Sequence, residues 1–139
     1  MNEYKIQDLF EGKTESFTVS VTEDMLAKFY EITGDSNPLH LDSSYAKSKN
    51  IFKDKVAYGM LTASFCSTLA GVYLPGKYSL IQDVKLSFPK PVYVGDTLEV
   101  SGEVTAIHES LNNFEMKVSV VNQDGERVLR GKMMVGFLV

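Results

Sequence analysis

Cysteine is nearly absent from this sequence: the chain of 139 residues contains Cys66 alone. No disulfide can form within the chain, so a hydrophobic core has to stabilise the fold. One free thiol is compatible with a reducing compartment, and we expect a cytoplasmic protein. The N-terminal segment, MNEYKIQDLFEGK, mixes charges of both signs and lacks the apolar run of a signal peptide. Secretion is therefore not indicated.

Clustered positive charge is also missing. The chain has 14 Lys and Arg residues against 18 Asp and Glu residues, a formal net charge of -4, and its basic residues are scattered. Nucleic acids and anionic membranes attract clusters of Lys and Arg, so we expect neither as a partner. Repeats and low-complexity segments are absent as well, and we predict a single domain over residues 1–139.

One long stretch contains no charge at all. It runs from Val56 to Gly76, reads VAYGMLTASFCSTLAGVYLPG, and is close in length to a membrane span. Two features favour a buried helix instead, because the stretch ends at Pro75 and contains four hydroxyl side chains, Thr62, Ser64, Ser67 and Thr68. We predict a central helix from Gly59 to about Val72 and no membrane span.

Periodicity and capping residues predict the elements around this helix. Alternating apolar residues predict a strand at 15–21, and Thr22 then offers a hydroxyl N-cap to an amphipathic helix that runs to about Thr33. Gly34 is a suitable end for that helix, and 41–50 fits a second short helix or turn. Later strands are predicted around Val84–Phe88, Leu98–Val104, Phe114–Val120 and from Val128 onward, with a hairpin turn at Asn122–Gly125.

The order of these elements indicates the fold class. The helices lie between the first strand and the later ones, without the regular alternation of strand and helix that builds a parallel sheet. We predict an α+β fold in which a curved antiparallel sheet wraps around the long apolar helix. An enclosed helix needs no charged face, so we expect the sheet to cover this helix on most sides.

Residues 31–40, EITGDSNPLH, combine an acid, Asp35, with an imidazole, His40. On a continuous helix these side chains would point about 140° apart and could not cooperate. Pro38 breaks the helix, so the two can converge across a rigid turn, with Asn37 available to orient them by hydrogen bonds. Alternatively, Asp35 and Asn37 form an Asx-type turn and His40 satisfies a nearby carbonyl group. The spacing leaves both interpretations open.

Three segments resemble the MaoC-like hydratases, the (R)-specific enoyl-CoA hydratases. Residues 30–46, YEITGDSNPLHLDSSYA, are similar to the family signature at Gly34, Asp35, Asn37, Pro38, His40 and Ala46. Residues 59–64, GMLTAS, and 88–96, FPKPVYVGD, resemble two further family segments. The resemblance covers nearly the whole chain. It implies a hotdog fold, in which an antiparallel sheet surrounds a long central helix.

The resemblance also implies an activity, the reversible addition of water to a trans-2-enoyl thioester, which yields an (R)-3-hydroxyacyl thioester. Such a reaction needs a base for the water, an acid for C2, and stabilisation of the negative charge on the thioester oxygen. We expect His40 to act as the principal base, with Asp35 binding the water and delivering its proton to C2. Gly59, at the head of the central helix, would present its backbone N–H to the thioester oxygen.

Other residues are carried over as substrate-binding: Asn37, Tyr58, Met60 and Ser67. The family most often has His-Gly-Met where this chain has Tyr58-Gly59-Met60, and we expect the change to alter substrate contacts or pocket shape. Ser67 would line the acyl end of the pocket, although a helical serine can equally bond to a preceding carbonyl group. No metal and no cofactor are expected.

The two remaining reactive side chains are given no role. His108 lies in a polar turn between strands and is predicted to be exposed, and Cys66 is predicted to be a packed thiol within an apolar helix.

Two alternatives to a hydratase stay open, a hotdog acyl-CoA thioesterase and a non-catalytic module that binds acyl-CoA. We predict a homodimer, or a higher oligomer, with the thioester at the interface. The resemblance indicates fatty acid metabolism, but it does not identify the acyl length or the choice between coenzyme A and acyl carrier protein.

Overall fold

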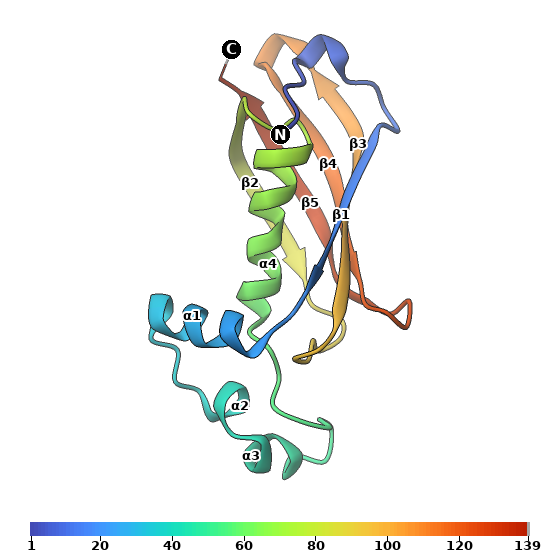
Figure 1. Ribbon diagram of the computed structural model, residues 1–139. Helices are drawn as coiled ribbons and strands as arrows, with labels where there is room; N and C mark the ends of the chain where they lie inside the picture. Colours follow the sequence, from blue (N-terminus) through green and yellow to red (C-terminus); the bar gives the residue numbers. More distant parts are fainter. Residues whose placement is uncertain (139) are drawn as a thin grey trace.

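The computed structural model describes residues 1–138. One antiparallel sheet has the strand order β1-β3-β4-β5-β2 and curves around the helix α4 (Figure 1). The strands are β1 (Thr14–Ser20), β2 (Ser79–Ser87), β3 (Thr97–His108), β4 (Asn113–Val121) and β5 (Arg127–Phe137). The strands β3, β4 and β5 follow one another in the chain, and each pairs with the next. The strands β1 and β2 pair with β3 and β5 and form the two edges of the sheet. The predicted α+β architecture is confirmed.

The helical elements are concentrated between β1 and β2. They are α1 (Glu23–Thr33), α2 (Pro38–Leu41), α3 (Ser43–Lys47), α4 (Gly59–Thr68) and a π turn η2 (Leu69–Tyr73), and two 3-10 turns lie elsewhere, η1 (Ile6–Asp8) and η3 (Glu109–Leu111). The predicted central helix is thus α4 continued by a wider turn, in which Leu74 N–H donates to the Leu69 carbonyl oxygen at 2.8 Å. No helix within 1–138 combines the length and the hydropathy that crossing a membrane requires.

The start and end of α1 follow from capping chemistry. The Thr22 hydroxyl accepts a hydrogen bond from Met25 N–H at 3.2 Å, which satisfies one of the free donors of the first turn. Gly34 ends the helix in the left-handed conformation, with φ 69°, and its N–H donates to the Tyr30 carbonyl oxygen at 2.7 Å. Both residues were predicted from the sequence. This end of α1 turns the chain toward α2.

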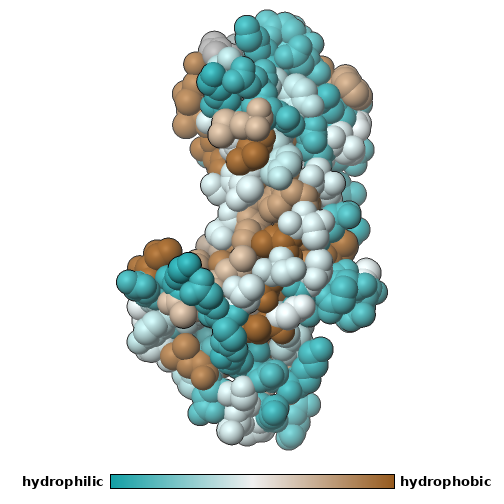
Figure 2. Space-filling view, viewed as in Figure 1, coloured by the Kyte–Doolittle hydropathy of each residue, from teal (hydrophilic) through white to brown (hydrophobic). Residues whose placement is uncertain are grey.

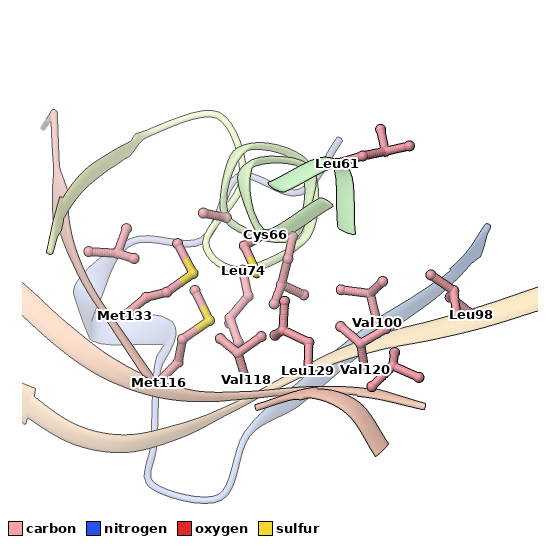
Figure 3. Packing of buried hydrophobic residues seen from close by; sticks show 14 of the residues in the cluster. Leu61, Cys66, Leu74, Leu98, Val100, Met116, Val118, Val120, Leu129 and Met133 are labelled. Atoms are coloured by element: carbon pink, nitrogen blue, oxygen red, sulfur yellow. The ribbon is translucent and has the colours of Figure 1, made fainter. Parts of the chain in front are cut away.

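The core lies between α4 and the inner face of the sheet. Strand residues two apart point toward the helix, as strand geometry requires (Figure 3). Fully buried members include Leu98, Val100, Val104, Phe114, Met116, Val118, Val120, Leu129, Met133 and Val135, which pack with Cys66, Leu69 and Leu74 from the helix and its continuation. This packing fixes the position of α4 against the sheet, and so fixes the place of its N-terminus.

The sheet encloses α4 less than the sequence predicted. Along one face of the helix Ser64 and Ser67 are exposed, as is Met60, with 65% of its surface accessible. Figure 2 looks toward α4 and shows apolar and weakly polar residues gathered along it. The expectation that the sheet covers the helix on most sides is therefore wrong for this face. Burial under the sheet does not by itself account for the absence of charge.

Candidate active site

The turn between α1 and α2 is built from side-chain hydrogen bonds to the backbone. The Asp35 carboxylate accepts from Asn37 N–H at 3.1 Å, and the Asn37 side-chain oxygen accepts from Leu39 N–H at 3.0 Å, capping α2. Pro38 occupies the first turn of α2, where a missing N–H costs nothing. The Asx-type turn is thus present. Its geometry holds the backbone that carries Asp35 and His40.

His40 is half-buried on α2, and its ring is fixed by the main chain. Its Nδ1 lies 2.7 Å from the carbonyl oxygen of Val56. A carbonyl group can only accept, so Nδ1 carries the proton and donates. In the neutral ring the lone pair is then on Nε2, which is free to take a proton. The bond to a carbonyl group therefore leaves Nε2 as the ring nitrogen that can accept a proton.

One cavity of about 270 Å³ brings the predicted catalytic residues together. It is lined by Asp35, His40 and Gly59, and also by Phe29, Thr33, Tyr58, Met60 and Phe88. The acid and the imidazole come from the turn and from α2, while Gly59 begins α4, 24 positions after Asp35 in the sequence. Asp35 and His40 thus line the same cavity, as the prediction from Pro38 requires. The chemical roles of these residues remain predictions.

The head of α4 has an unused hydrogen-bond donor. Within residues 1–138, no acceptor receives the Gly59 N–H, and the N-cap position Tyr58 provides no side-chain cap. The first turn of α4 also lacks an acidic residue that would neutralise the positive end of the helix dipole. A donor of this kind is suited to an oxygen that becomes negative during a reaction.

Tyr58 lines the cavity and also makes contacts within the protein. Its hydroxyl donates to the Asp35 carbonyl oxygen at 2.8 Å, and only 2% of the residue is exposed. Its ring centroid lies 4.2 Å from that of His40, at an interplanar angle of 30°, and 5.0 Å from that of Phe29. Desolvation by burial, and then the charge of Asp35, raises the pKa of Tyr58 above its usual value of 10.0.

The other residues carried over as substrate-binding lie in different surroundings. Met60 lies exposed on the wall of the cavity. The Asn37 side chain is occupied as the cap of α2. Ser67 lies exposed on α4, does not line this cavity, and has no side-chain hydrogen bond within the part of the chain described, whereas Ser64 bonds to the Leu61 carbonyl oxygen at 2.6 Å. The structure therefore does not bring Ser67 to the acid and the imidazole.

Sequence reasoning missed Phe88. Its ring atoms lie 3.5 Å from the position that a Cβ on Gly59 would occupy. Phe88 lines this cavity and also a second cavity of about 270 Å³, and His40 and Gly59 likewise line both. Phe88 begins the third of the segments that resemble the family, which was the available signal. Phe88 is 46% exposed, which is consistent with a ring that lines two open cavities.

Cys66 and His108 stay outside the site. Burial raises the pKa of the Cys66 thiol to about 11, so the thiol remains protonated and unreactive at neutral pH, as predicted. His108 ends β3 and is half-buried, so the prediction that it is exposed is wrong in part. Among residues 1–138, no group of three or more His, Cys, Asp or Glu side chains could hold a metal ion.

Comparison with known proteins gives relatives that include (R)-specific enoyl-CoA hydratases. The chain is 37% identical over 110 residues to an (R)-specific enoyl-CoA hydratase of Aeromonas caviae, a match that covers 79% of this chain and 81% of that protein. It is 34% identical over 101 residues to an (R)-specific enoyl-CoA hydratase of Rhodospirillum rubrum, with 73% and 69% covered.

Solved structures agree in their fold. The unliganded R-hydratase PhaJ1 of Pseudomonas aeruginosa superposes with a TM-score of 0.88 at 33% identity, covering 96% of this chain and 84% of that one. The (R)-hydratase of A. caviae also gives 0.88, at 34% identity, covering 94% and 98%. The predicted hotdog fold is confirmed by this likeness. Residues 7–125 match the family model described as a MaoC like domain, and the chain therefore belongs to the MaoC-like domain family.

Proposed function

We propose that this protein is an (R)-specific enoyl-CoA hydratase, which adds water reversibly to a trans-2-enoyl thioester. One observation carries the proposal. A carboxylate, an imidazole with its Nε2 lone pair available, and an unused backbone N–H at a helix N-terminus line a single cavity. The three groups supply what hydration of a conjugated thioester needs, namely proton transfer and stabilisation of an enolate.

In the proposed mechanism a water molecule binds between the Asp35 carboxylate and Nε2 of His40. His40 removes a proton as the oxygen attacks C3, and the electron pair of the double bond moves toward the thioester carbonyl group. The resulting enolate oxygen accepts the Gly59 N–H, where the dipole of α4 adds a favourable field. Collapse of the enolate takes up at C2 the proton that His40 removed from the water, relayed through the Asp35 carboxylate, so that both side chains regain their starting protonation. One hydroxyl and one proton are added in total, and the enzyme returns to its starting state.

Hydration of crotonyl-CoA tests the proposal, because the absorbance of the conjugated thioester disappears as water adds. Asp35→Asn is the informative variant, since an Asn side chain still accepts from Asn37 N–H and preserves the turn. We expect kcat to fall by about 10² to 10⁴, the usual contribution of a general acid or base, with the melting temperature unchanged.

Two results would contradict the proposal. The first is no turnover of enoyl thioesters of any chain length, and the second is an Asp35→Asn variant that hydrates at the wild-type rate. Release of free thiol from saturated acyl-CoA would identify a thioesterase instead. Tight binding of enoyl-CoA without product would identify a binding module. A series of chain lengths on coenzyme A and on acyl carrier protein would define the substrate.

We also propose that the protein is a homodimer. The helix α4 lies beside the edge strand β2 (Figure 1), whose outer edge has no partner strand among residues 1–138. Large apolar side chains are exposed there, namely Met60, Leu80, Ile81 and Val84. A second copy would cover these side chains and close the catalytic cavity. Light scattering checks this, and a stable active monomer would contradict it.

A further inference from the structure

We propose that Tyr58 is a positioning residue that holds both members of the catalytic pair, Asp35 through its hydroxyl and His40 through its ring. The inference rests on the proposed function, since it concerns residues to which that proposal assigns the chemistry. It also replaces the expectation that Tyr58 contacts substrate. The hydroxyl is already bound to the main chain, and the ring is covered on two sides by His40 and Phe29.

The turn that carries Asp35 has few attachments to the rest of the molecule. Residues 33–38 are all exposed. Their other hydrogen bonds are local, joining residues within 29–42. The bond from the Tyr58 hydroxyl to the Asp35 carbonyl oxygen is the only one among residues 1–138 that reaches 33–38 from outside this segment. It therefore decides where the Asp35 carboxylate lies relative to α4.

The same side chain restrains the imidazole. The edge of the His40 ring is fixed by Val56 through Nδ1, and one ring face packs on Tyr58 with centroids 4.2 Å apart. Rotation about χ2 would break the hydrogen bond and the ring contact together. Because Tyr58 immediately precedes Gly59, the backbone N–H at the head of α4 is tied to the same anchor. One residue thus relates the acid, the base and the oxyanion donor in space.

A phenol serves this role differently from the imidazole that the family most often has here. The ionisable groups that face Tyr58 are His40 on α2, Asp35 in the turn and Tyr30 on α1. Burial, Asp35 and Tyr30 all raise the pKa of Tyr58, so its hydroxyl remains a neutral donor wherever histidine titrates. An imidazole at this position could gain a proton near neutral pH and would then no longer be a neutral donor. With tyrosine, His40 is the one imidazole of the site.

Kinetics of two substitutions test the first half of the proposal. Tyr58→Phe keeps the ring and removes the hydrogen bond, and we expect kcat to fall about 3- to 10-fold with KM within twofold of wild type. Tyr58→Leu removes the ring as well and should fall further. Tyr45→Phe is the matched control, because Tyr45 is 38% exposed on α3, does not line the cavity, and should leave both constants unchanged. Full kcat in a folded Tyr58→Phe variant would overturn the role of the hydroxyl.

Proton NMR tests the second half without relying on turnover. The chain has two histidines, so the ring signals of His40 and His108 can be assigned with His108→Gln. The Tyr58 ring should shift the His40 signals away from those of a free histidine, and Tyr58→Leu should move them back while His108 stays unchanged. Unchanged His40 signals in Tyr58→Leu would overturn the proposal, whereas a wild type without hydratase activity would overturn only the proposed function.

Discussion

Replacing Gly59 by alanine should separate folding from catalysis. Gly59 does not have a positive φ, and a Cβ placed on it would lie 3.5 Å from the Phe88 ring, an ordinary van der Waals contact. A Gly→Ala change at a compatible position stabilises a protein by about 0.4–1 kcal/mol. For a domain of this size that corresponds to a rise in melting temperature of about 1–4 °C. The folded state should accept the methyl group without strain.

Catalysis should respond in the opposite direction. The new methyl group occupies the space through which the thioester oxygen must approach the Gly59 N–H, because Gly59 lines the catalytic cavity. Losing one donor to an oxyanion costs about 10² to 10³ in kcat. We therefore expect Gly59→Ala to melt at or above the wild-type temperature and to hydrate crotonyl-CoA at least 100-fold more slowly, a loss of about 2.7 kcal/mol in transition-state stabilisation.

Gly12→Ala is the matched control, with the opposite expected pattern. Gly12 has a φ of +93° and nothing within 4 Å of an added Cβ, so the substitution meets backbone strain rather than a clash. It should destabilise the fold by about 1–3 kcal/mol and leave kcat intact. Wild-type kcat in Gly59→Ala would refute a backbone role for Gly59 in catalysis. A large drop in its melting temperature would refute the argument that the methyl group fits.

Two further substitutions or reagents probe the surroundings of the site. Asn37→Ala should cost about 1 kcal/mol in the free energy of unfolding and lower kcat, because it removes the cap of the short helix that carries His40. Asn37→Asp keeps a capping oxygen and should retain both the stability and kcat. Thermal melts and hydration rates check this, and equal effects of the two substitutions would contradict it. Cys66 should resist alkylation at pH 8 in the native protein and react only on unfolding, because its pKa of about 11 leaves very little thiolate; rapid native labelling would count against this.

Local chemistry explains why much of the site could be predicted from the sequence. Thr22 and Gly34 bound α1 through hydrogen bonds to residues three or four positions away, so the signals lie next to each other in the chain. The Asx turn at Asp35 is local for the same reason. Alternation at period two likewise revealed the strands, because one face of the sheet packs on the core.

The remaining features depend on partners that are distant in sequence. His40 bonds to the carbonyl group of Val56, 16 positions away, and Tyr58 bonds to that of Asp35, 23 positions away. A backbone carbonyl group is the same in every residue, so nothing in the sequence marks those two as acceptors. The exposed face of α4 was missed because an uncharged helix indicates burial without indicating what covers it.

The exposure of the segment from Thr33 to Leu41 affects how readily its sequence can vary during evolution. None of its residues is buried, although it carries both the proposed acid and the proposed base. Enzymes whose reactive groups are embedded in the core must trade stability for activity when those groups are altered. Here a library that varies Ser36 or Leu41 alters the catalytic segment while the sheet and α4 keep their packing. Selection for new substrates can therefore act on this segment with little loss of folded protein.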